Sequence, residues 1–234
     1  MSWKSLGISA RGRTINVGFD LDRNYRNTRE IIELARHFAS PSTNDEDDGM
    51  LCLPVDPAKA RRSIGMNPVL IDAKTRSLEC RRVCRIVEKL LRGRWLEHDL
   101  PSPLVGKDIG ILYPMIPAQS KNLFRQFLDD LRKLDSVVWL TSQGNEDLRA
   151  RVNDPGIKVQ TIHSAKGLEY RAVIIMWADM LPRDFHGHDD EEESCVMYVA
   201  LTRERDLLAI TYTGEGSDFT KKIHRSRAVL LRSG

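Results

Sequence analysis

The chain has 234 residues, and its 36 Lys and Arg against 33 Asp and Glu leave a formal net charge of only +3. A hydrophobic fraction of 41% allows a buried core, yet no apolar run approaches the roughly 20 residues that a membrane-spanning helix needs. The N-terminus lacks the apolar segment of a secretory signal, so we expect a cytoplasmic protein without a membrane partner. The weak positive charge does not by itself identify a nucleic-acid-binding protein.

The first predicted element is a helix that begins at Asn27. A capping side chain there, followed by Glu30, is typical of a helix start, and apolar residues then recur at helical spacing as far as Phe38. Residues 40–49 are polar and acidic and include Pro41, which indicates a loop.

Short apolar runs alternate with amphipathic segments over the rest of the chain. The runs predict buried strands at residues 69–71, 109–113, 137–140, 159–162, 173–177 and 207–212. The amphipathic segments predict helices at residues 76–91, after a capping Ser120 as far as 131, at 145–152 and at 191–201. This alternation predicts an α/β fold with a mainly parallel sheet and, through right-handed crossovers, helices on both of its faces.

The cysteines are scattered and do not have the spacing of a metal site. Cys80 and Cys84 fall on one face of a predicted helix, with no further Cys or His nearby at ligand spacing. We therefore expect buried or partly buried free thiols and no bound metal.

Three segments carry the functional signal. Residues 159–170 read VQTIHSAKGLEY, residues 198–205 read YVALTRER, and residues 21–28 read LDRNYRNT. The first two in this order, supported by the third upstream, resemble motifs of superfamily 1 DNA helicases of the UvrD/Rep type, from the C-terminal, second RecA-like domain. Asn27 stands where the family usually has Ser or Thr.

The resemblance implies a RecA-like fold of the P-loop NTPase type that lacks its own phosphate loop, because no G-x-x-x-x-G-K-[ST] sequence occurs in the chain. The resemblance covers residues 1–234 and implies a single domain, in which residues 1–20 form a segment that leads into the first motif. Only residues 142–157 lie where some relatives insert a large accessory domain, so we expect none here. The phosphate loop and the Mg²⁺ site would belong to an N-terminal RecA-like domain in cis, or to a partner ATPase in trans. We expect the chain alone not to hydrolyse ATP.

The resemblance assigns ATP contacts to five residues. Arg203 and Arg26 would be arginine fingers, which neutralise charge that builds up during phosphoryl transfer. Tyr25 would stack on the adenine, Gly167 would let the backbone approach a phosphate, and Glu169 would accept from the ribose. Without the motifs, Arg203 would read as a surface arginine paired with a neighbouring acid. Tyr25 would likewise read as an aromatic packed on the next helix, and Gly167 as a turn glycine.

The same resemblance assigns single-stranded DNA contacts to Thr161, His163 and Lys166. A hydroxyl, an imidazole and an ammonium group can all reach phosphate oxygens without reading a base, which suits a motor that moves over any sequence. Outside this motif, His163 would be read as a structural histidine.

The leading hypothesis is therefore the C-terminal motor domain of an ATP-dependent DNA helicase. A second hypothesis is a stand-alone, non-catalytic module that kept the helicase fold and binds nucleic acid or regulates a partner. A third is an unrelated α/β nucleotide-binding domain that matches the motifs by chance.

Overall fold

The computed structural model describes residues 24–39, 56–62, 66–140, 151–165, 167–183 and 190–232, without the side chains of residues 24–26, 59–62 and 190. The predicted lead-in of residues 1–20, the predicted loop of residues 40–49 and most of the helix predicted at residues 145–152 lie outside the described residues.

A parallel sheet of seven strands, in the order β11-β3-β10-β9-β6-β8-β7, forms the centre of the described part. Its strands are β3 (Val69–Ala73), β6 (Ile109–Tyr113), β7 (Val137–Trp139), β8 (Ile157–Thr161), β9 (Tyr170–Ile175), β10 (Glu204–Thr213) and β11 (Leu230–Arg232). Two short pairs lie apart from it: β1 (Asn24–Thr28) with β2 (Ala60–Arg62), and β4 (Arg94–Trp95) with β5 (His98–Asp99).

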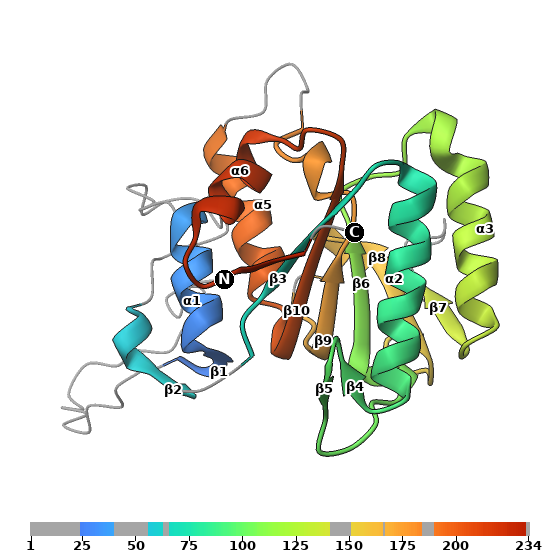
Figure 1. Cartoon of the computed structure of the whole chain (residues 1–234), viewed down its shortest axis with the longest axis horizontal. Helices are drawn as coiled ribbons and strands as arrows, with labels where there is room; N and C mark the ends of the chain where they lie inside the picture. Colours follow the sequence, from blue (N-terminus) through green and yellow to red (C-terminus); the bar gives the residue numbers. More distant parts are fainter. Residues whose placement is uncertain are drawn as a thin grey trace, which may run out of the picture.

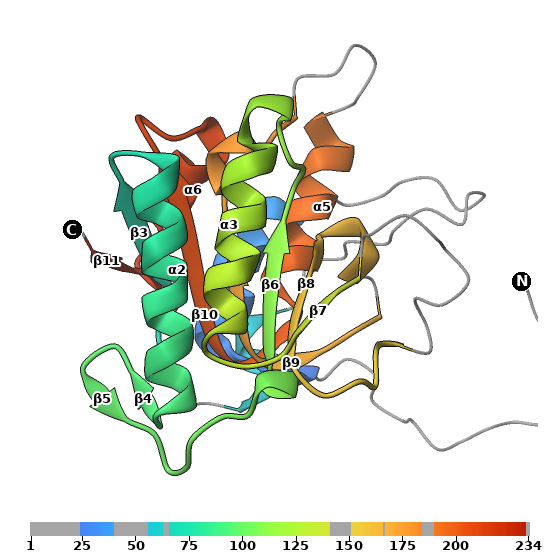
Figure 2. The ribbon, with the colours of Figure 1, turned by 90° about the vertical axis from the view of Figure 1, so that its right-hand side faces the viewer.

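Helices cover both faces of this sheet, as Figures 1 and 2 show. The helices are α1 (Arg29–Ala35), α2 (Arg76–Leu91), α3 (Lys121–Arg132), α5 (Asp190–Leu201) and α6 (Asp218–Arg225). Short 3-10 turns are η2 (Arg36–Phe38), η3 (Pro57–Lys59), η4 (Gly106–Asp108), η5 (Ala118–Ser120), η6 (His163–Ala165) and η7 (Ala178–Met180). Helices α2 and α3 lie on one face, and α1, α5 and α6 lie on the other. The predicted α/β fold with a parallel sheet and helices on both faces is confirmed.

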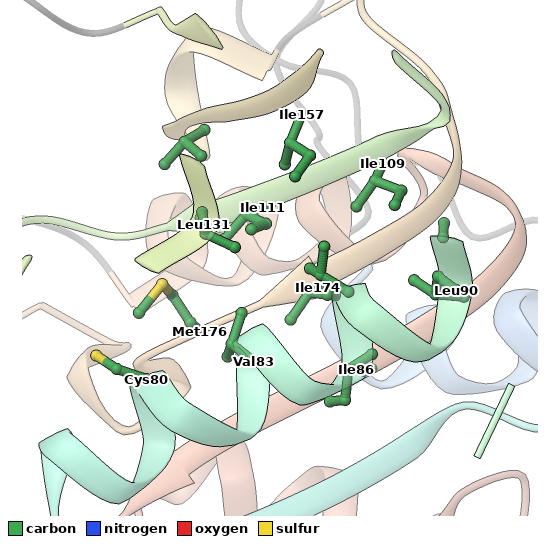
Figure 3. Packing of buried hydrophobic residues seen from close by; sticks show 14 of the residues in the cluster. Cys80, Val83, Ile86, Leu90, Ile109, Ile111, Leu131, Ile157, Ile174 and Met176 are labelled. Carbon is green, nitrogen blue, oxygen red and sulfur yellow. The ribbon is translucent and has the colours of Figure 1, made fainter. Parts of the chain in front are cut away.

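The core divides into two layers because successive residues of a strand point to opposite faces. Ile109 and Ile111 of β6 pack with α2 and α3, whereas Leu112 packs with α1, α5 and α6. Figure 3 shows the first layer, where one side of α2, including Val83 and Leu90, meets the sheet. Each fully buried aliphatic side chain contributes about 1.5–3 kcal/mol relative to exposure.

The thiols of α2 are free and unreactive. Burial raises the pKa of Cys80 and of Cys84 to about 12, so both stay protonated at neutral pH. The described residues contain no group of three potential metal ligands. None of the helices that the structure describes is long and apolar enough to cross a membrane.

The predicted capping role of Asn27 is wrong. Helix α1 begins at Arg29, its N-cap residue is Thr28, and Asn27 belongs to strand β1. The amide of Asn27 instead has buried tertiary acceptors next to β10, which a local capping pattern does not reveal. Ser120 does take the N-cap position of α3, but its side chain makes no capping bond.

A buried carboxylate joins α2 to the carboxyl ends of β9 and β10. Glu79 is fully buried, and its Oε1 accepts from the Trp177 backbone N–H and the Thr211 hydroxyl, each at 2.7 Å. Its Oε2 accepts from the Thr213 hydroxyl at 2.5 Å and from the Arg76 guanidinium at 3.2 Å. Burial raises the pKa of Glu79, and these hydrogen bonds oppose the rise.

We expect Glu79→Leu to lower the free energy of unfolding by on the order of 3 kcal/mol, because it removes the acceptor of the buried Trp177 N–H and of the Thr211 and Thr213 hydroxyls. Urea denaturation followed by circular dichroism measures the change. The matched control is Glu88→Leu on the same helix, where a half-exposed pair with Arg92 is lost and the change should stay below about 1 kcal/mol. Equal losses in both variants would show that the Glu79 network adds nothing.

Candidate functional site

The connection from β8 to β9 runs from one edge of the sheet to the other. Thr161 ends β8 opposite Tyr113, the last residue of β6, so it lies at the carboxyl edge. Tyr170 begins β9 opposite Glu204, the first residue of β10, so it lies at the amino edge. These strands are parallel, and a strand as long as β9 spans about 20 Å. Residues 162–169, called the crossover below, therefore link two distant edges.

The crossover is packed against the helices of its face. Ile162 and Ala165 are buried in the same apolar cluster as residues of α1 and α5, and Leu168 packs against that cluster. The path of the crossover is thus fixed by the burial of these side chains as well as by strands β8 and β9 at its two ends.

Arg203 lies over the amino-edge end of the crossover. It follows α5 and precedes β10, and its side chain is partly buried. Its Nε donates to the carbonyl oxygen of Val199 at 3.1 Å, and its Nη1 donates to that of Leu168 at 3.5 Å. The guanidinium is therefore beside the backbone of Glu169.

Gly167 and Glu169 are both exposed in this last part of the crossover. Gly167 has a φ of +87°, which favours glycine, and a Cβ there would meet no described atom within 4 Å. The positive φ of this turn therefore accounts for a glycine at this position. No described atom would crowd a side chain there. Of Tyr25 and Arg26 only the backbone, in β1, is described; their side chains lie outside the described residues.

Thr161 and His163 lie at the other end of the crossover. The Thr161 hydroxyl is 2.8 Å from the Ser164 hydroxyl and accepts from the Ser164 N–H at 3.3 Å, which closes the turn after β8. His163 is exposed, with its Nε2 3.3 Å from Nη2 of Arg183. Lys166 lies outside the described residues.

An ion pair that no local sequence pattern indicates supports this end of the crossover. Arg183 Nη2 lies 2.5 Å from Oε1 of Glu193, whose side chain is 1% exposed, and the Arg183 backbone N–H donates to Oε2 at 2.8 Å. Glu193 belongs to the acidic start of α5, where a carboxylate is also favoured by the helix dipole. Nothing local in the sequence distinguishes this buried carboxylate from its exposed neighbours Glu191 and Glu192.

Tyr170 fixes the point where the crossover becomes strand β9. Its hydroxyl accepts from Gln160 Nε2 at 2.8 Å, and its backbone N–H donates to the Arg203 carbonyl at 3.0 Å. Its ring covers Gly110 so closely that a Cβ there would lie 2.4 Å from a ring carbon. Burial raises the pKa of Tyr170 to about 12, and the bond from Gln160 partly opposes this.

The expected site residues thus form two groups, which we call the amino-edge group and the carboxyl-edge group. The amino-edge group comprises Gly167, Glu169, Arg203 and the backbone of Tyr25 and Arg26. The carboxyl-edge group comprises Thr161 and His163, with Arg183 beside them. The crossover is the covalent link between the two.

Comparisons with known proteins agree with the motifs. Residues 117–215 match the UvrD-like helicase C-terminal domain family. A segment of 63 residues is 41% identical to the ATP-dependent DNA helicase PcrA of Staphylococcus epidermidis, covering 24% of this chain and 9% of that protein. PcrA of Staphylococcus aureus is 34% identical over 73 residues, or 28% of this chain and 10% of that protein. The chain therefore matches only about a tenth of the length of these relatives.

The fold comparison extends further along the chain. The crystal structure of the C-terminal domain of a possible DNA helicase from Lactobacillus plantarum matches with a TM-score of 0.56 at 15% identity. The match covers 89% of this chain and 98% of that one, and at this identity it supports the RecA-like fold alone.

The buried Tyr170 predicts a steeper loss of stability at alkaline pH. Its pKa is about 12 in the folded chain and about 10 when unfolded, so the unfolded state releases the proton first. Folding stability from this group is complete below about pH 10 and falls as the pH rises towards 12, by on the order of 2–3 kcal/mol. Urea denaturation between these pH values should show a shallower decline for Tyr170→Phe than for the unaltered chain. Parallel declines would contradict the assignment.

Proposed function

We propose that this chain, in which residues 117–215 match the UvrD-like helicase C-terminal domain family, serves as the second RecA-like motor domain of an ATP-dependent DNA helicase or translocase. ATP with Mg²⁺ would bind between the amino-edge group and a first RecA-like domain, supplied in cis or in trans. Single-stranded DNA would bind at the carboxyl-edge group. The observation that carries this proposal is the crossover, which joins the two groups through residues 162–169.

At the amino edge the chemistry of the side chains suits a nucleotide. Arg203 is partly buried, and its guanidinium lies beside the backbone of Glu169, whose side chain is exposed. In the proposed site Arg203, together with Arg26, stabilises charge on the phosphates during transfer, while Glu169 accepts from the ribose and Tyr25 stacks on the adenine. The phosphate loop and the Mg²⁺ ligands come from the first domain, since this chain has no phosphate loop.

At the carboxyl edge the proposed contacts are to phosphates. Thr161 and Lys166 offer a hydroxyl and an ammonium group, and the exposed His163 stands beside the Arg183 guanidinium. Contacts of this kind are independent of base sequence, as translocation along any strand requires. Arg183 adds positive potential at this end, moderated by its pair with Glu193.

Domain closure would couple the two sites. When the two RecA-like domains close on ATP, the amino-edge group moves with the nucleotide, and the crossover carries that displacement to the carboxyl edge. Because Ile162, Ala165 and Leu168 are packed against the neighbouring helices, the crossover moves with the domain as a unit. Alternating closure and opening would then change the contacts between the carboxyl-edge group and DNA.

We expect Arg203→Ala to lower ATP turnover by on the order of 1,000-fold, the effect of removing an arginine finger, while single-strand binding persists. Steady-state hydrolysis is measured after adding the first RecA-like domain of Staphylococcus epidermidis PcrA to the chain. Arg205→Ala is the matched control, because Arg205 is an exposed arginine two positions away.

Two results would contradict the proposed role of Arg203. One is an equal loss of hydrolysis in Arg205→Ala. The other is an equal loss of hydrolysis and DNA binding in Arg203→Ala. If the unaltered chain binds DNA but never raises hydrolysis by the added domain, a non-catalytic binding module is the better description.

We expect Lys166→Ala to weaken binding of the chain to oligo(dT) and to reduce the slope of log affinity against log salt concentration by about 0.7, one phosphate contact for a single strand. Fluorescence anisotropy over a range of NaCl concentrations measures both quantities. Lys107→Ala is the control, because Lys107 is exposed in η4, before β6 at the opposite edge. An unchanged slope in Lys166→Ala removes this lysine from the phosphate contacts.

A further inference from the structure

One buried amide touches the backbone on both sides of Arg203. Nδ2 of Asn27 lies 3.3 Å from the carbonyl oxygen of Thr202 and 2.8 Å from that of Glu204. It also lies 2.8 Å from Oε1 of Glu204. Asn27 is 1% exposed and Glu204 is fully buried, so these bonds form away from water, where they are stronger than at a surface.

The remaining backbone groups of Arg203 are also held. Its N–H donates to the Ala200 carbonyl at 3.4 Å, and its carbonyl accepts from the Tyr170 N–H at 3.0 Å. With Asn27 on the flanking carbonyls, the peptide units on either side of Arg203 are fixed from three different elements. The direction of the Cα–Cβ bond of Arg203 is thereby set before any ligand binds, and the side chain beyond it is held by its bonds to the carbonyl oxygens of Val199 and Leu168.

The same amide also fixes the segment that carries the second candidate finger. Asn27 directly follows Arg26 in β1, and its partners Thr202 and Glu204 lie 175 and 177 positions further along the chain. Few single side chains could make this link. An amide nitrogen has two hydrogens to share among three oxygens, whereas a serine or threonine hydroxyl has only one hydrogen.

We infer that Asn27 is a positioning residue that, with Glu204, locks Arg26 and Arg203 into one preformed unit at the amino edge. The inference rests on the proposed function, in which both arginines contact the nucleotide. Held in this way, the backbone segments that carry the two arginines keep a fixed spacing as the domains close. A preorganised charge is worth more to the transition state than one that must be reoriented during the reaction.

The decisive substitution is Asn27→Asp. It keeps the size of the side chain and replaces its donors with acceptors, which then face two carbonyl oxygens and a carboxylate. Asn27→Ser keeps one donor and should behave as an intermediate. Asn67→Asp is the matched control. The Asn67 amide also donates to a carbonyl oxygen distant in sequence, that of Ala228 at 2.9 Å, but this oxygen does not flank Arg203.

The first readout is NMR of the whole isotope-labelled chain, observing the Nε–H of Arg203, which donates to Val199. We expect slow exchange of this proton in the unaltered chain and in Asn67→Asp, and faster exchange in Asn27→Asp, with Asn27→Ser between them. An unchanged Arg203 signal in Asn27→Asp would overturn the inference. So would an equal change in Asn67→Asp, since that would report general destabilisation.

The second readout is ATP hydrolysis with the first RecA-like domain of PcrA added. A misplaced finger lowers kcat by about 100-fold and changes KM for ATP little, since the contact matters in the transition state. If Arg203→Ala abolishes hydrolysis but Asn27→Asp does not, the positioning role is overturned and the proposed function stands. If Arg203→Ala has no effect on hydrolysis, the proposed function fails, and this is recognised independently of the NMR result.

Discussion

The common direction of the strands is the constraint on which the arrangement of this domain depends. In a parallel sheet each connection must return from the carboxyl edge to the amino edge. Most connections here do so with a helix, but in that from β8 to β9 the described residues form one 3-10 turn and no α-helix. Polar residues at its start and end are therefore both close in sequence and far apart in space. In the proposed function, this geometry lets one short segment contact ATP at one end and DNA at the other.

Buried polar groups hold the edges of the sheet to the helices. Glu79 ties α2 to β9 and β10, Arg183 and Glu193 tie α5 to the segment after β9, and Asn27 ties β1 to β10. Each group is costly to bury without its partners, so each specifies one arrangement and disfavours near alternatives. The apolar layers supply most of the driving force for folding, and these contacts set where the ends of the strands lie.

Local patterns predicted the elements whose burial is regular. Helix α2 and strand β6 have the predicted bounds because their apolar residues follow the periods of a helix and a buried strand. Helix α6 went unpredicted, although Ser217 and Thr220 form a capping box before buried Phe219 and Ile223. The motifs predicted ATP contacts for Arg203 and Glu169; the structure places Arg203 beside the Leu168 carbonyl, next to Glu169, and the ATP contacts stay predictions. The partners of Asn27 and Arg183 could not be predicted, since they depend on contacts between distant parts of the chain.

The contact between Gly110 and Tyr170 changes how genetic data on such a domain are interpreted. Gly110 lies inside the sheet and belongs to neither group of site residues, but any side chain there meets the Tyr170 ring. Tyr170 in turn bonds the carbonyl of Arg203. A loss-of-function allele at this glycine would therefore map to the interior of the sheet while acting through the backbone of the site. Intolerance to substitution at residue 110 would thus reflect a steric clash with the Tyr170 ring, and it carries no information about ligand contact.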